Sequence, residues 1–125
     1  MTSEDNNQEK WEVQLRKGTL ELVILAALQG RCLYGLELLK LLHQFKSATI
    51  SEGTLYPLLE RLKRDDLVDA KWVQEGENRP RKYYRLTAAG EQKLRNLTAI
   101  WRQSAADIEH LLKHPGQQAM PTSRQ

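Results

Sequence analysis

Apolar side chains recur with helical spacing over the first part of the chain. Residues 11–29 predict a helix whose segment Leu22–Leu28 is apolar on every side, as in a helix buried inside a domain. Gly30 is a natural stop for this helix. A second helix is predicted from Tyr34 to Phe45, because its apolar residues lie three and four positions apart and line one face. The pattern therefore opens with two helices joined by a tight connection.

A third helix is predicted from Ser51 to Asp66. Its inner face is formed by leucines at the i, i+3, i+4 and i+7 positions, namely Leu55, Leu58, Leu59 and Leu62. Ser51 or Thr54 can cap its start. Pro57 is awkward for a start at Ser51, because its ring removes a backbone donor and crowds the carbonyl of Gly53. The sequence thus predicts either a distorted first turn or a helix capped by Thr54.

The pattern then changes to the alternation that is typical of strands. Residues 68–74 alternate between apolar and polar side chains, with Trp72 on the apolar side, and residues 82–86 alternate in the same way. The turn-rich residues 75–80 between them are longer than a minimal hairpin loop. These segments predict two antiparallel strands that form a wing.

Thr87 is predicted to cap a final helix that runs to about Lys113. Its apolar residues recur at alternating spacings of three and four positions, which is the seam of a helix that packs against another helix. The seam includes Leu94, Leu97, Trp101, Ile108 and Leu111. We expect these residues to form a dimer interface, against the first helix of a partner copy.

This order of elements predicts an α+β, mainly α, fold class: a winged helix-turn-helix with a long C-terminal dimerisation helix. With 125 residues the chain has the usual size of one domain. The winged domain is expected to span residues 10–87 and the dimerisation helix residues 88–113. The polar segment 1–9 and the Pro- and Gly-containing segment 114–125 are expected to be disordered tails.

Charge is distributed unevenly along the chain. The net charge of +3 is compatible with a polyanionic partner but too small to demonstrate one. Acidic Glu4, Asp5 and Glu9 lie in the N-terminal tail. Basic residues gather in the middle of the chain: Arg61, Lys63, Arg64, Arg79, Arg81, Lys82 and Arg85. This separation indicates a basic face.

Other classes of protein are disfavoured by the motifs that the sequence lacks. No apolar run approaches the roughly 20 residues of a membrane helix, and the N-terminus lacks a secretory signal, so a cytoplasmic location is expected. There is no phosphate loop, zinc-binding His pair or nucleophile elbow, so no enzyme, cofactor or metal is expected. The single Cys32 is interpreted as a small core residue, with redox sensing as the alternative.

Two regions carry side chains suited to nucleic acid. The face of the third helix opposite its leucines presents six residues: Gly53, Glu60 and Arg64 near its centre, Thr54 and Arg61 on one flank and Tyr56 on the other. Arg binds guanine or phosphate through paired hydrogen bonds, hydroxyl groups donate to phosphate or bases, and Gly53 allows the backbone to approach closely. Arg79, Arg81 and Lys82 at the hairpin tip can straddle the phosphate backbone or reach a minor groove. The alternative is that these cations merely solvate the surface.

Several motifs follow one another along the chain: Arg16–Leu28, then Tyr34, Gly35 and Glu37, then Ser51–Leu59, then Arg79–Tyr84, and finally Leu86, Thr87 and Gly90. Together they resemble the PadR-like family of transcriptional regulators. The resemblance covers roughly residues 15–97. Spaced motifs in the right order are far more specific than any one of them alone.

The resemblance implies a homodimer that binds an inverted-repeat operator in double-stranded DNA, usually as a repressor. The recognition helices would enter successive major grooves and the wings would lie on the flanking backbone. It also implies weaker DNA contacts from Lys17 and from Tyr34, for which structural packing is an equal alternative. In some small members a flat hydrophobic effector lies between aromatic residues at the dimer interface. Trp101 and Trp11 are candidates for that role, although Trp101 in a seam is more typical of dimer packing.

Two functions of other classes stay open. A protein-interaction module would use the same fold to bind a partner protein, and salt-dependent binding to a specific duplex would exclude it. A small-molecule sensor without a DNA role would depend on Trp101 and tolerate the loss of Arg61 and Arg81.

Overall fold

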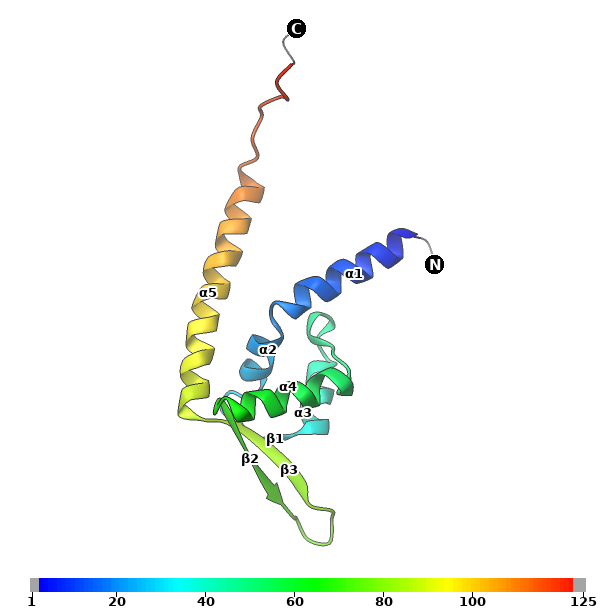
Figure 1. The fold of residues 1–125 in the computed structure, drawn as a ribbon, viewed down its shortest axis with the longest axis vertical. Coiled ribbons are helices and arrows are strands. Elements are labelled where there is room, and N and C mark those ends of the chain that lie inside the picture. Colours follow the sequence, from blue (N-terminus) through cyan, green and yellow to red (C-terminus); the bar gives the residue numbers. More distant parts are fainter. Residues whose placement is uncertain (1–2, 123–125) are drawn as a thin grey trace.

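The structure of the chain, a computed structural model, describes residues 3–122. The elements are α1 (Ser3–Lys17), α2 (Leu20–Ala27), β1 (Leu33–Tyr34), α3 (Gly35–Leu42), the short 3-10 helix η1 (Lys46–Ala48), α4 (Glu52–Arg64), β2 (Val68–Val73), β3 (Arg81–Leu86) and α5 (Ala88–Lys113). The β2–β3 hairpin and α5 both leave the body near one end of α4 and extend in nearly opposite directions (Figure 1). This is the winged helix-turn-helix with a long C-terminal helix that the sequence predicts.

The core lies between α2, α3, α4 and the base of the sheet. All four inner leucines of α4 are buried, as predicted: Leu55, Leu58, Leu59 and Leu62. They pack with Ile24 and Leu25 of α2 and with Leu38 of α3. Val68 and Tyr84 close the core on the side of the sheet. Each fully buried leucine contributes roughly 1.5–3 kcal/mol relative to an exposed one, so this cluster fixes the orientation of α4.

The sheet is antiparallel, with the strand order β1-β3-β2. β2 and β3 pair along their lengths, with Trp72 opposite Lys82, in agreement with the predicted hairpin. β1 was not predicted, and its Tyr34 lies opposite Tyr83. A strand of two residues is too short to leave an alternating pattern in the sequence, so only the fold reveals it.

The N-terminal region differs from the sequence prediction in two ways. Residues 11–29 form parts of two helices rather than one, because Gly18 and Thr19 interrupt them. The backbone N–H and the hydroxyl of Thr19 both donate to the carbonyl oxygen of Arg16, at 3.0 and 3.2 Å, which ends α1. In addition, α1 begins at Ser3, so residues 3–9 are helical where a disordered tail is predicted. No Gly or Pro interrupts this stretch, and its polar residues are compatible with a helix. Residues 1–2 of that tail lie outside the described part of the chain.

Cys32, predicted to be a core residue, and Phe45, predicted to line the apolar face of the second helix, both lie on the surface. Cys32 is exposed, because it lies between Gly30, which turns the chain with a φ of 72°, and the edge strand β1. Phe45 is 55% exposed, because α3 ends at Leu42 and the chain turns before Phe45 could join the inner face. The interpretation of Cys32 as a core residue and the placement of Phe45 on the helical face are therefore corrected.

The start of α5 is held tightly against the end of α4. Thr87 caps α5 as predicted, because its hydroxyl oxygen accepts from the N–H of Gly90 at 2.9 Å. The same hydroxyl donates to the carbonyl of Asp66 at 2.6 Å. A side chain on Gly90 would overlap the carbonyl of Leu67, so α5 passes directly over the turn that follows α4. The long helix is thus rigidly connected to the helix predicted to read DNA.

Beyond α5, residues 114–122 form neither helix nor strand. The disorder predicted for residues 114–125 stays a prediction, and residues 123–125 lie outside the described part. Within residues 3–122, none of the helices combines the length and the apolar character that crossing a membrane demands.

Candidate nucleic-acid interface

Helix α4 presents its outer face from the first turn onward. It begins at Glu52 with Ser51 as the N-cap residue, and it continues through Pro57 to Arg64. Of the two alternatives left by the sequence, the early start is therefore correct. Gly53 and Thr54 are exposed in this first turn, and the hydroxyls of Ser51 and Thr54 lie 3.2 Å apart. A methyl group on Gly53 would meet only the Ser51 hydroxyl, at 3.8 Å, so open space lies beside this part of the helix.

Tyr56 links α4 to the start of α3. Its ring covers Gly35, and a Cβ on Gly35 would overlap that ring. Tyr56 nevertheless remains 39% exposed. Its position is therefore both structural and accessible, whereas the sequence indicated only a surface role.

Tyr34 organises an aromatic cluster at the base of the wing. The guanidinium of Arg81 lies 4.5 Å from the centre of the Tyr34 ring, within the range of a cation–π interaction. Tyr83 meets Tyr34 edge to face, with ring centres 5.5 Å apart. The carboxylate of Glu37 accepts from the backbone N–H of Tyr34 at 3.2 Å, which holds it at the start of α3. Tyr34 thus packs and at the same time orients a wing cation.

Lys82 of the wing forms an ion pair with Glu60 of helix α4. Its ammonium donates to Glu60 Oε1 at 2.9 Å, and the hydroxyl of Tyr84 donates to the same oxygen at 3.3 Å. The hydrogen bond from Lys82 lowers the pKa of Glu60, and the same bond raises the pKa of Lys82, so both groups are charged at neutral pH. The sequence predicted Lys82 as a free DNA-binding cation and gave no signal for this ion pair.

A hollow of about 410 Å³ lies between the wing and the helices α3 and α4. It is lined by Tyr34, Gly35, Leu36, Tyr56, Trp72, Pro80, Arg81, Lys82 and Tyr84. Trp72 is 66% exposed, and the sequence did not identify it as a candidate. The strand alternation places it on the inner side correctly, but the hairpin reaches beyond the core at this position. A tryptophan on a strand whose hairpin turn is followed by basic residues is the sequence signal that could have identified it.

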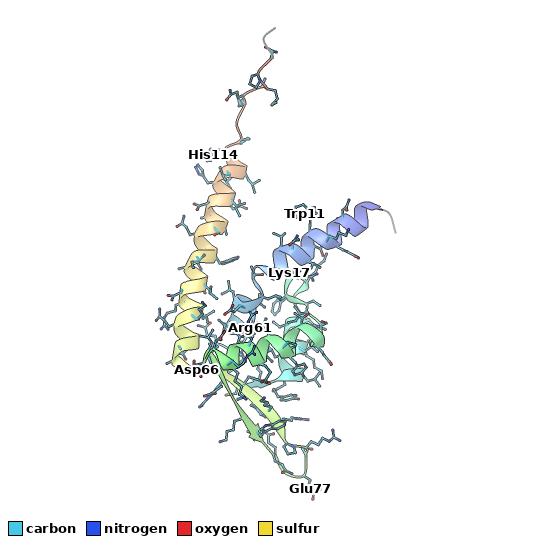
Figure 2. The ribbon with its side chains drawn as sticks, viewed as in Figure 1. Trp11, Lys17, Arg61, Asp66, Glu77 and His114 are labelled. Atoms are coloured by element: carbon cyan, nitrogen blue, oxygen red, sulfur yellow. The ribbon has the colours of Figure 1, made fainter. Side chains whose placement is uncertain are left out.

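Other predicted cations lie away from this hollow. Arg61 is near α2, where its guanidinium approaches the carboxylate of Glu21 to 3.8 Å, and Arg64 ends α4. Lys17 lies at the end of α1, with α4 between it and the wing tip at Glu77 (Figure 2). Arg79 is exposed in the tip itself. The structure therefore brings together Tyr34, Tyr56, Arg81 and Lys82, and it separates Lys17 and Arg61 from them.

The seam of α5 divides into a buried and an exposed part. Leu94 belongs to the core of this chain and Leu97 packs against it, so both side chains are already covered within the single chain, and their role in a dimer interface stays a prediction. Trp101, Ile108 and Leu111 are 49–70% exposed. Leu112, which the prediction omitted, is exposed as well and lies five turns beyond Leu94 on the same face. The apolar face of α5 thus continues past the body of the chain.

A second hollow, of about 870 Å³, lies where α1, α2 and α5 meet. Trp101 lines it, together with Leu15 of α1 and Val23 of α2. Trp11 is 69% exposed on α1 and lies outside this lining. The structure therefore brings only one of the two candidate tryptophans to the hollow.

Comparisons with known proteins agree with this architecture. The family model "Transcriptional regulator PadR-like family" matches residues 24–96. A PadR family transcriptional regulator from Eggerthella lenta DSM 2243 is 34% identical, with a TM-score of 0.80 over 90% of this chain and 98% of that one. A PadR-like regulator from Bacillus cereus strain ATCC 14579 is 30% identical, with a TM-score of 0.74 over 82% of this chain and 99% of that one. An uncharacterized protein from Lysinibacillus sphaericus is 29% identical over 70% of this chain and 82% of its own length.

Proposed function

Because this chain belongs to the PadR-like family of transcriptional regulators, we propose that it is a repressor that binds an inverted-repeat operator as a homodimer. Members of the family are regulators that bind DNA and are not enzymes. A regulator must be in the same compartment as the DNA that it binds, so we propose a cytoplasmic location.

The observation that carries the proposal is the face shared by α4 and the wing. The first turn of α4 is exposed and carries the small Gly53, so the backbone of the helix can approach the floor of a major groove. Arg81, held against Tyr34, lies beside that helix and is placed to contact the phosphate backbone. Arg79 at the tip extends the same basic surface along the duplex.

The exposed face of α5 supports the homodimer. Trp101, Ile108 and Leu112 continue the line of Leu94, which is already buried in this chain. A second copy is the occupant that we propose, because α1 carries exposed Trp11 and Leu15 that a partner's α5 would cover. Two-fold symmetry would then place two recognition helices on two half-sites about one DNA turn apart. Repression would follow because the bound dimer blocks the access of RNA polymerase to the promoter.

Selection from a random pool of duplexes tests the proposal, and we expect it to enrich an inverted repeat. Binding to the enriched duplex should weaken steeply with salt, because each neutralised phosphate contributes roughly 0.9 to the slope of log K against log salt. The double variant Arg79→Ala, Arg81→Ala removes two cations from each protomer, so for the dimer it should reduce that slope by about 3.6 and weaken binding to all duplexes. Fluorescence anisotropy at several salt concentrations measures both effects.

A matched control removes two positive charges far from the wing, through Lys40→Ala and Lys113→Ala. This variant should keep the wild-type salt dependence. If selection enriches no duplex while the protein is folded and dimeric, the repressor function is wrong. An equal loss of slope in both double variants would show that net charge, and not the wing, governs binding.

The hollow beside Trp101 favours a hydrophobic effector as a second, regulatory role. We expect the aromatic probe 8-anilinonaphthalene-1-sulfonate to bind there and to quench Trp101 fluorescence. Trp101→Ala should remove most of the probe signal, whereas Trp72→Ala, on the wing, should preserve it. Trp11→Ala separates the two sequence candidates, because only a site shared across the dimer would need it. Binding that survives Trp101→Ala would contradict the effector site.

A further inference from the structure

An acidic side chain, Glu60, is bonded to the wing within the surface that we propose for DNA. Glu60 projects from the later part of α4 toward strand β3 of the wing. Its carboxylate is held by two donors, the ammonium of Lys82 and the hydroxyl of Tyr84. Lys82 and Tyr84 are separated by one residue on β3, so both side chains reach α4 from the same face of the sheet.

We propose that Glu60 is a specificity-determining residue that withholds Lys82 from the phosphates of non-operator DNA. The proposal rests on the proposed function, since it concerns the same DNA-binding surface. It assigns to Glu60 a role beyond stabilising the wing: the ion pair lowers affinity where only charge attracts the protein to DNA.

The ion pair is placed to have this effect. The Lys82 side chain is only 23% exposed, and its ammonium lies 5.6 Å from the centre of the Tyr84 ring. A phosphate that binds Lys82 must therefore either separate it from Glu60 or approach the Glu60 carboxylate, and both cost free energy. The pair also neutralises Lys82, which lines the hollow beside the wing together with Arg81.

The free energy needed to separate Lys82 from Glu60 affects non-specific complexes more than operator complexes. Non-specific binding depends almost entirely on phosphate contacts, so the loss of one available cation weakens it directly. An operator complex also gains base contacts from α4, and these require the wing and the helix to keep a fixed relation. The Lys82–Glu60 bond maintains that relation, so operator binding loses little while non-specific binding is reduced.

Glu60→Gln tests the inference, because it removes the charge and keeps an oxygen that can accept from Lys82 and Tyr84. We expect affinity for a random-sequence duplex to rise by about threefold to tenfold, with a salt slope steeper by roughly 1.8, because each protomer of the dimer frees one Lys82. Affinity for the selected operator should change by less than about threefold, so the specificity ratio falls. Thermal unfolding of each variant verifies that the fold is retained.

A double-mutant cycle with Lys82→Met identifies the source of the effect. In the Lys82→Met background Glu60→Gln should no longer steepen the salt slope, because no ammonium remains to be released. Glu91→Gln, which removes one negative charge from the start of α5, should leave both affinities unchanged.

Equal gains on operator and random DNA, no gain at all, or a gain that persists without Lys82 would each overturn the inference. Wild-type protein that binds no duplex would instead overturn the proposed function, and the inference with it. The two failures are therefore distinguishable.

Discussion

Replacing Trp101 and Ile108 together by glutamate is expected to separate the dimer and to weaken operator binding by about 100-fold to 10,000-fold. Both side chains are about half exposed in the single chain, so their replacement leaves the core of each protomer intact. In the dimer they would be buried, and two unpaired carboxylates from each protomer in an apolar interface oppose association strongly. Linked heads bind the second half-site at a high effective concentration, and monomers lose that advantage.

Sedimentation equilibrium and fluorescence anisotropy measure this prediction on the same samples. Binding to an isolated half-site should change little, which separates a loss of dimerisation from a loss of DNA contact. Asn96→Glu adds a charge to the opposite face of α5 and should preserve the dimer. A double variant that remains dimeric would place the interface elsewhere. A variant that loses the half-site as well would show that α5 supports the winged domain directly.

Enlarging Gly53 to leucine is expected to weaken operator binding by about 100-fold without unfolding the protein. In the free chain the space beside Gly53 is open, since a Cβ would meet only the hydroxyl of Ser51. In the proposed complex the groove would occupy that space, and a branched side chain would hold α4 away from the bases. Anisotropy with the operator and thermal unfolding of the free protein give the two readouts.

Gly53→Ala distinguishes an effect on DNA binding from an effect on folding more clearly, because stability should rise while operator affinity falls. Alanine in a helix is more stable than glycine by up to about 1 kcal/mol, so the unfolding temperature should rise while operator affinity falls. Gly116→Leu, in the segment after α5 with open space around it, is the matched control and should affect neither. Unchanged affinity in Gly53→Leu would show that this turn of α4 does not enter the groove.

The sequence predicted the elements whose side chains repeat over several turns or strand positions. The leucines of α4 and the cap at Thr87 lie as predicted, because each depends on spacing within one segment. β1 was not predicted, because its two residues form a strand only through their pairing with β3. The break between α1 and α2 depends on the local hydrogen bonds of Thr19, which no hydrophobic period reveals.

The candidate site was predictable as a set of residue types but not as an arrangement. The pairing of Arg61 with Glu21 and of Lys82 with Glu60 joins residues that are 40 and 22 positions apart, so it appears only after folding. Strand alternation correctly predicts the side of the sheet on which Trp72 lies, but it does not show where along the strand the core ends. The residues that the sequence missed are thus those whose role depends on contacts between distant segments or on how far the hairpin extends beyond the core.

The tight junction between α4 and α5 also bears on how such a regulator can diverge. Gly90 admits no side chain beneath Leu67, so the direction in which α5 leaves the body is fixed. Each residue inserted in a helix advances it by about 1.5 Å and turns it by about 100°. In a lineage of such proteins, substitutions on the surface of α4 would alter the preferred bases gradually. The distance between half-sites would instead be inherited with the length of the arm, and it would change only in discrete steps that restore the same apolar face.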